Sequence, residues 1–127
     1  MILNLSELSS EPLHAQITRQ IRAKILSHDL AGEEPIPSIR ALAREQRVSV
    51  ITVQRAYDDL ERDGLLQSRR GKGFWVTSIP ERRRQTMARE RFAEALGELV
   101  EQASAEGLAA SDMRRVLEVI LEKGRER

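Results

Sequence analysis

The amino-acid sequence predicts a mainly α fold with a small β-hairpin, followed by a C-terminal two-helix region. Three patterns carry this prediction: two short helical segments joined by a tight turn, an alternating segment around a glycine-rich tip, and two amphipathic segments near the C-terminus. The length of 127 residues suits one compact domain plus an appendage, since domains cluster around ~100–150 residues. We expect a first domain over residues 1–79 and a second region over residues 80–127.

Composition excludes several classes of protein. The absence of cysteine rules out disulfides, thiol chemistry and cysteine-ligated zinc, and it fits a reducing cytoplasm. The N-terminus lacks the basic start and apolar core of a signal peptide, and no run approaches the ~20 apolar residues that cross a bilayer. The 21 basic and 20 acidic side chains nearly cancel, so total charge does not indicate a nucleic-acid partner. We expect a cytoplasmic protein that does not bind membranes.

A first helix is expected directly after Pro12, which suits a first helical turn. Its buried stripe repeats every four residues and consists of Leu13, Ile17, Ile21 and Ile25. The segment AGEEPIP, residues 31–37, contains glycine and proline and is predicted to be a loop.

Two short helices follow in close succession. Ser38 can cap the first and Ser49 the second, while Gly64 can end the second in a left-handed conformation. The residues expected to face inward are Ile39, Leu42, Ala43, Val53, Ala56, Tyr57 and Leu60. The turn between the helices holds one apolar residue, Val48, and the whole segment matches the helix-turn-helix pattern.

The next segment, LLQSRRGKGFWVTS, alternates apolar and polar residues around the tip from Arg70 to Gly73, which predicts a two-stranded hairpin. A phosphate-binding nucleotide loop is the alternative for such a glycine-rich run. That loop requires G-x-x-x-x-G-K-[ST] before a helix, whereas here a β-branched and aromatic run follows. A hairpin beside a helix-turn-helix is a wing, and the cations at its tip can reach phosphates or the minor groove.

The C-terminal region begins after Pro80 with the run Arg82, Arg83 and Arg84, which we interpret as a solvated helix start, with phosphate contact as the alternative. Gly107 should end the first long helix, and Ser111 can cap the second. Two such helices cannot enclose their own apolar stripes, so we expect a symmetric dimer interface. Its candidate residues are Phe92, Leu96, Leu99, Val100, Val116, Leu117 and Ile120.

Three linked motifs, IPSIRALA, VSVITVQRAYDDLERDGLL and RRGKGFWV, resemble the winged helix-turn-helix of GntR-type bacterial transcription regulators over roughly residues 11–78. The two C-terminal helices, in place of a large ligand-binding domain, look like the YtrA subgroup. The resemblance implies a repressor that binds a palindromic DNA operator as a homodimer. It identifies no small-molecule effector and no cofactor.

The resemblance also implies which residues contact DNA. By position, these are Ser38 and Arg40 at the first short helix, Ser49, Val50, Ile51, Thr52 and Gln54 facing the major groove, and Arg70, Gly71 and Lys72 in the wing. Val50 and Gln54 stand where many members carry arginine, so the base preference cannot be copied from relatives. Arg47 stands where many members have glycine, so the turn must accept a side chain in a conformation that favours none.

Physical reasoning adds Arg55 to this set. Thr52, Gln54 and Arg55 lie off the buried stripe near the start of the second short helix, where glutamine can pair with adenine and arginine with guanine. The alternative is a solvated helix surface, and for Arg40 a surface ion pair. Arg62 is expected to lie over its own helix, and Trp75 to join Tyr57 in the core.

No catalytic or metal-binding pattern stands out. His14 and His28 are isolated from other ligand residues, and no nucleophile-base or paired-carboxylate arrangement occurs, so we expect neither an enzyme nor a metal site. Two other functions stay open: a winged-helix protein-interaction adaptor without sequence-specific DNA binding, and a ligand sensor or enzyme whose large domain is missing. The complete appearance of the C-terminal helices disfavours the latter.

Overall fold

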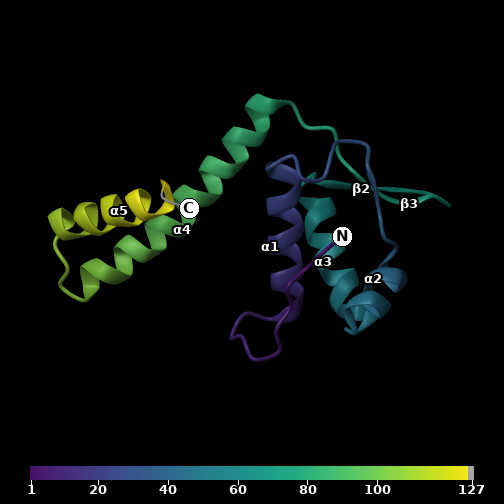
Figure 1. The fold of residues 1–127 in the computed structure, drawn as a ribbon, viewed down its shortest axis with the longest axis horizontal. Coiled ribbons are helices and arrows are strands. Elements are labelled where there is room, and N and C mark those ends of the chain that lie inside the picture. The colour runs from purple at the N-terminus through teal and green to yellow at the C-terminus, as the bar shows by residue number, and fades with distance from the viewer. Residues whose placement is uncertain (126–127) are drawn as a thin grey trace. The chain divides into compact units, whose positions relative to one another are not determined.

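Residues 1–125 are described by a computed structural model (Figure 1). Its elements in chain order are α1 (Leu13–Leu26), β1 (Pro35–Ile36), α2 (Ile39–Gln46), α3 (Val50–Arg62), β2 (Leu66–Arg69), β3 (Gly73–Val76), α4 (Glu81–Ala105) and α5 (Ala110–Arg125). The chain divides into two compact units, Met1–Gln85 and Thr86–Arg127. The mainly helical fold with a small antiparallel sheet confirms the predicted fold class.

The core of the first unit lies where α3 packs against α1 and α2. Ile17, Ile21 and Ile25 of α1 are fully buried, as predicted. The predicted inner face of α3 is also fully buried and comprises Val53, Ala56, Tyr57 and Leu60. Because one face of α3 is buried in this core, the opposite face of the helix lies at the surface.

Tyr57 joins the core to the sheet. Its hydroxyl donates a hydrogen bond of 2.7 Å to the carbonyl oxygen of Pro37, and its ring meets that of Phe74 edge to face with 4.9 Å between centroids. Burial raises the pKa of Tyr57 well above its ordinary value, with a smaller contribution from the charge of Glu45. The phenol is therefore held in its neutral, hydrogen-bond-donating form.

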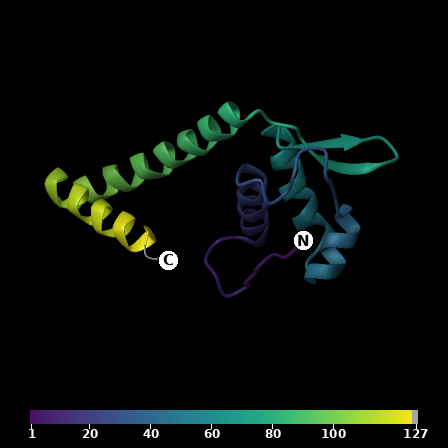
Figure 2. The same ribbon diagram turned by 45° about the horizontal axis from the view of Figure 1, so that its top comes forward.

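The sheet has the strand order β1-β3-β2, with both pairs antiparallel. The predicted hairpin is confirmed, and Figure 2 shows it projecting from the helices of its own unit. The prediction of a loop over residues 31–37 was wrong in part, because Pro35 and Ile36 pair with Trp75 and Phe74. Two residues are too few to produce an alternating pattern, and proline is tolerated there because β1 is an edge strand.

The helix boundaries follow local hydrogen bonds that the sequence predicted. The Oγ of Ser38 accepts from the backbone N–H of Ala41, and the Oγ of Ser49 accepts from that of Thr52, both at 3.1 Å. Arg47, at the end of α2, adopts the left-handed conformation with φ 57° and ψ 43°. Such a conformation costs a non-glycine residue about 1–2 kcal/mol, so the tight turn is held by the packing around it.

The run Arg82–Arg84 corrects one prediction, because Arg84 is buried rather than solvated, with 4% of its surface exposed. Its Nε donates to the carbonyl oxygen of Ile79 at 3.1 Å, and its Nη1 donates to the carbonyl oxygen of Ile25 near the end of α1. Glu81 Oε2 lies 2.5 Å from Nε2 of His28, just beyond α1, within hydrogen-bonding distance. These contacts fix the first turn of α4 to the first unit.

The second unit is a helical hairpin of α4 and α5, with Gly107 in the turn at φ 89°. The predicted cap at Ser111 was wrong, because α5 begins one residue earlier at Ala110. The carbonyl oxygen of Ala109 already accepts from the backbone N–H of Met113 at 3.1 Å, which places Ser111 inside the first turn. From Thr86 to Arg125, no side chain is buried.

Candidate nucleic-acid interface

The outer face of α3 carries five of the eleven residues predicted to contact DNA. Ile51 is 79% exposed and Val50 is 46% exposed, while Gln54 and Arg55 are also exposed and Thr52 is half-buried. These residues belong to the first half of the helix and lie off the stripe that packs against α1 and α2. Val50 and Ile51 are large aliphatic side chains, yet they face water at the start of α3 and do not contribute to the core.

Exposed cations also occur on the elements that neighbour α3 in the chain. The set consists of Arg40, Arg44 and Arg47 in and after α2, Arg55 in α3, and Arg70 and Lys72 at the hairpin tip. Within residues 1–125 none of these side chains forms an ion pair or a hydrogen bond, so the ion pair considered for Arg40 is not formed. Cations without internal partners can accept external anions without breaking a contact.

Other cations are already paired. Arg62, expected to lie over its own helix, forms an ion pair of 3.1 Å with Asp59 on that helix, and this pair was not predicted. Arg22 pairs with Asp63 at 3.0 Å, and Lys24 pairs with Asp29 at 3.3 Å. Within the first unit, six of the seven unpaired arginines and lysines therefore lie on the helix-turn-helix and hairpin, and the seventh is Arg83 in α4.

The two predicted serine contacts have structural partners as well. Ser38 Oγ accepts the N–H of Ala41, and Ser49 Oγ lies 2.8 Å from Thr52 Oγ1. The hydroxyl hydrogen of Ser38 is not used by its capping bond, so it can be donated to a phosphate oxygen. Either hydroxyl can be the donor between Ser49 and Thr52, so Ser49 keeps its hydrogen for a phosphate when Thr52 donates.

Gln54 is engaged on the surface of α3. Its Nε2 donates to Asp58 Oδ1 at 3.0 Å, one helical turn further along. This bond was not predicted from the sequence, although the i,i+4 spacing of glutamine and aspartate is a known signal for it. Asp58 therefore belongs to the candidate interface.

The tip end of the hairpin is held by Arg69, which pairs with Gly73 beside the turn and forms an ion pair with Glu33. Hydrogen bonding from Arg69 holds the pKa of Glu33 below its ordinary value. The Arg69 guanidinium also lies 4.6 Å from the ring centroid of Trp75, and the Trp75 Nε1 donates to the carbonyl oxygen of Lys72 at 3.2 Å. The expectation of a core role for Trp75 was wrong, because it is half-buried and supports the hairpin instead.

The tip itself follows from glycine chemistry. Gly71 has φ 75° and Gly73 has φ 83°, a region in which side chains are strained. The backbone N–H of Lys72 donates to the carbonyl oxygen of Arg69 at 2.8 Å and closes the turn. Arg70 and Lys72 are therefore presented on a turn whose backbone is fixed.

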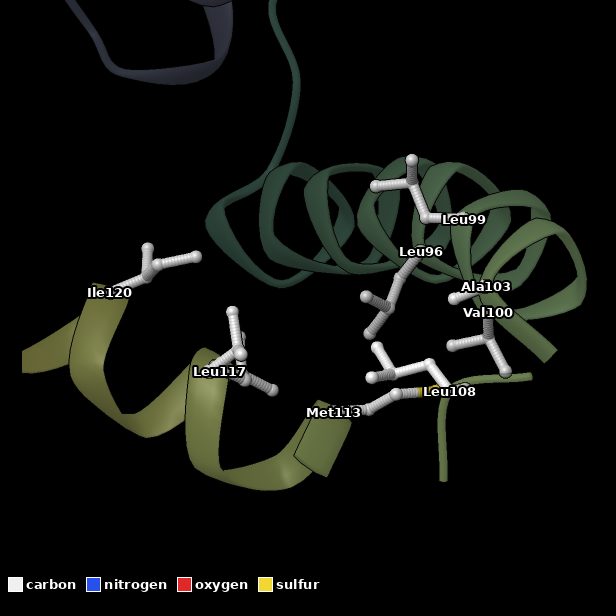
Figure 3. A pocket seen from close by; sticks show the side chains of 9 residues that line it. Leu96, Leu99, Val100, Ala103, Leu108, Met113, Leu117 and Ile120 are labelled. Atoms are coloured by element: carbon white, nitrogen blue, oxygen red, sulfur yellow. The ribbon is translucent and has the colours of Figure 1, made fainter. Parts of the chain in front are cut away.

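The second unit presents a different surface. Its two helices line an open apolar groove of about 190 Å³ (Figure 3), bounded by Leu96, Leu99, Val100, Ala103, Leu108, Met113, Val116, Leu117 and Ile120. This groove gathers all of the predicted dimerisation residues except Phe92, which is 56% exposed outside it. Enclosed pockets for drug-sized ligands span ~300–1,000 Å³, so this groove is too small and too open for one.

Residues 1–125 contain no group of His, Asp or Glu side chains that could hold a metal ion. In the same residues, no helix combines the length and the apolar character that crossing a membrane requires.

Comparison with protein families gives a match over residues 13–76 to "Bacterial regulatory proteins, gntR family". A relative, "Uncharacterized HTH-type transcriptional regulator YhcF" of Bacillus subtilis (strain 168), is 29% identical over 91% of this chain and 95% of its own length. "HTH-type transcriptional repressor YtrA" of the same organism is 30% identical over 60% of this chain and 58% of its own length. The chain thus spans nearly all of YhcF and little more than half of YtrA.

Solved structures resemble the chain over similar ranges. The GntR family transcriptional regulator from Listeria monocytogenes has a TM-score of 0.70 at 26% identity and covers 87% of this chain and 96% of its own. YtrA from Sulfolobus acidocaldarius has a TM-score of 0.60 at 30% identity, with 76% and 99% covered. AraR(DBD) in complex with operator ORX1 has a TM-score of 0.53 at 30% identity, with 61% and 95% covered.

Proposed function

Because the chain belongs to the gntR family of bacterial regulatory proteins, in its YtrA-like subgroup, and is a DNA-binding transcriptional regulator, we propose that it is a cytoplasmic repressor that binds a palindromic operator as a homodimer. The observation that carries the proposal is the set of exposed, unpaired cations on the helix-turn-helix and hairpin. They lie on the elements that winged helix-turn-helix proteins present to DNA.

In this proposal α3 lies in the major groove. Gln54, Arg55 and Thr52 supply polar contacts to base edges, and the exposed Val50 and Ile51 supply apolar contact to thymine methyl groups. Ile51 is 79% exposed, so the first unit leaves most of this side chain in water. Contact with a base would cover it.

Phosphate contacts come from both sides of α3. Ser38 and Arg40 at the start of α2 and Ser49 at the start of α3 contact one stretch of backbone. The hairpin tip of Arg70, Gly71 and Lys72 contacts another or enters the minor groove. Such contacts set the orientation of the protein on the duplex, while the base contacts set the sequence preference.

Dimerisation is assigned to residues 80–127, apart from the first turn of α4, which is tied to α1. The support is the lack of any buried side chain from Thr86 to Arg125, together with exposed fractions of 61% for Leu99 and 59% for Ile120. Two helices that leave their apolar faces in water are unstable alone. A second copy presents an identical surface and can cover it in a two-fold symmetric interface.

The competing function is a protein-interaction adaptor. The net charge of +1 is compatible with either function. A mobility-shift assay at moderate salt, with genomic fragments that include the promoter of the protein's own gene, separates the two. A repressor binds at least one fragment far more tightly than bulk DNA. Binding of all fragments at the nonspecific level would favour the adaptor.

Arg40→Ala is expected to weaken operator binding by about 1–3 kcal/mol, because it removes a charged donor to phosphate and no core atom. Titration of labelled operator measures the change, and thermal unfolding checks that the fold is kept. Arg62→Ala is the matched control, since Arg62 is an exposed arginine already paired with Asp59. Equal affinities for the Arg40 variant and the parent would remove Arg40 from the interface.

Lys72→Ala is expected to lower affinity for all DNA sequences alike and to reduce the slope of log K against log salt by about one, as loss of a phosphate contact does. The slope is measured for an operator and for an unrelated duplex. Lys24→Ala, which removes a lysine paired with Asp29, serves as the control. A loss confined to the operator would assign Lys72 to base contact instead.

A further inference from the structure

The hydrogen bond between Gln54 and Asp58 bears on how the protein selects bases. Both residues are exposed on the outer face of α3, and Gln54 lies in the half of the helix assigned to the major groove. The bond joins Gln54 Nε2 to Asp58 Oδ1 at 3.0 Å. Within residues 1–125, Gln54 Oε1 receives no hydrogen bond.

The chemistry of the pair fixes which way the amide points. An ionised carboxylate only accepts hydrogen bonds, so Asp58 can bind the NH₂ group of Gln54 and repels its carbonyl oxygen. A free glutamine can turn its amide by half a rotation and exchange donor for acceptor. Next to Asp58, the favoured orientation directs the NH₂ group toward the carboxylate, and it leaves Oε1 without a hydrogen-bond donor.

Base edges in the major groove differ in what they offer to such an acceptor. Adenine presents an amino group at N6 and cytosine one at N4, whereas guanine and thymine present only acceptors and, in thymine, a methyl group. An outward Oε1 therefore matches adenine or cytosine. With adenine, the second hydrogen of the Gln54 NH₂ group can also be donated to N7.

We propose that Asp58 is a positioning residue that fixes the amide of Gln54, so that Gln54 selects an A·T base pair, in which adenine donates from N6 to Oε1 and accepts at N7 from the NH₂ group. This inference rests on the proposed repressor function and adds a specificity determinant to it. Asp58 acts through Gln54 rather than on the DNA directly. Its negative charge opposes phosphate binding, so removal of that charge alone should raise affinity for all sequences equally.

The test is binding-site selection from a randomised duplex library with the full-length parent and the Asp58→Asn variant. Asparagine keeps the size of aspartate but both donates and accepts, so both orientations of Gln54 become available. The parent is expected to select an A·T pair at one position of each half-site. In the variant, discrimination against G·C pairs at that position should fall by on the order of tenfold, while other positions are unchanged.

Two controls separate positioning from charge. Asp59→Asn removes the same charge from the neighbouring residue, which binds Arg62 rather than Gln54, and should keep the parental base preference. In a Gln54→Ala background, Asp58→Asn should cause no further change in base preference. Thermal unfolding of each variant reports whether α3 remains folded.

Each outcome decides the inference. It is overturned if Asp58→Asn keeps full discrimination, if Asp59→Asn changes the preference equally, or if the effect persists without Gln54. It is also overturned if the base pair relaxed by Gln54→Ala is G·C in the parental motif. Failure of the parent to select any motif is a different result, which removes the proposed repressor function and this inference with it.

Discussion

Replacing Leu99 and Ile120 together by arginine is expected to convert a homodimer into a monomer and to weaken binding to a palindromic operator by about 10²–10⁴-fold. Both side chains line the apolar groove of the α4-α5 hairpin and are more than half exposed in the single chain. Arginine at these positions would place like charges against each other across a two-fold interface. The affinity loss arises because the second half-site is no longer bound intramolecularly.

Size-exclusion chromatography with light scattering measures the assembly, and titration of palindromic and single half-site duplexes measures binding. The half-site affinity should change little, since no residue of the first unit is altered. Gln102→Arg is the control, because it adds an arginine to the exposed surface of α4 outside the groove. A monomeric parent, or a double variant that still dimerises, would refute the assignment.

A shortened chain gives an independent measurement of the same interface. Ending the chain at Gln85 removes the second unit but keeps the hydrogen bonds of Arg84 to Ile25 and Ile79. We expect a folded monomer, because the buried core residues belong to the first unit. Dimers of this shortened chain, with undiminished operator affinity, would place the interface outside α4 and α5.

Tyr57→Ala is expected to destabilise the first unit by about 3–5 kcal/mol, the usual cost of removing a large buried ring. The residue is fully buried, and its loss would open a cavity between α3 and the sheet and remove the contact with Phe74. Much of the total stability of a small domain would be lost, since that total is about 5–15 kcal/mol. Urea unfolding followed by circular dichroism measures the change.

Tyr57→Phe is the matched comparison, because it keeps the ring and removes only the hydroxyl that donates to Pro37. Its expected cost is about 1–3 kcal/mol, the penalty for leaving a part-buried carbonyl without a donor. The operator affinity of this variant at low temperature should be nearly that of the parent. A larger effect for phenylalanine than for alanine would contradict the packing role assigned to the ring.

Part of the candidate interface is predictable from the sequence because it depends on local periodicity. Once the apolar spacing of α3 fixes which residues are buried, the remaining residues must form its exposed face. The spacing alone therefore predicts that Gln54 and Arg55 lie at the surface. Which cations lack partners is not predictable in this way. Arg69 and Arg70 are neighbours in the sequence, yet only Arg69 pairs with Glu33, which is brought close by the pairing of β1 with β3.

Side-chain spacing and short-range hydrogen bonds are enough to specify the order of the first unit's helices, the caps at Ser38 and Ser49, and the glycine-rich hairpin. The positions of β1, Arg84 and Trp75 depend instead on contacts between segments far apart in the sequence. A two-residue strand forms only where a partner strand is available, and Arg84 is buried because the end of α1 lies within its reach. Trp75 lies on the outer face of the sheet, where its ring contacts Arg69. Strand register, rather than hydrophobicity, sets which sheet face a side chain occupies.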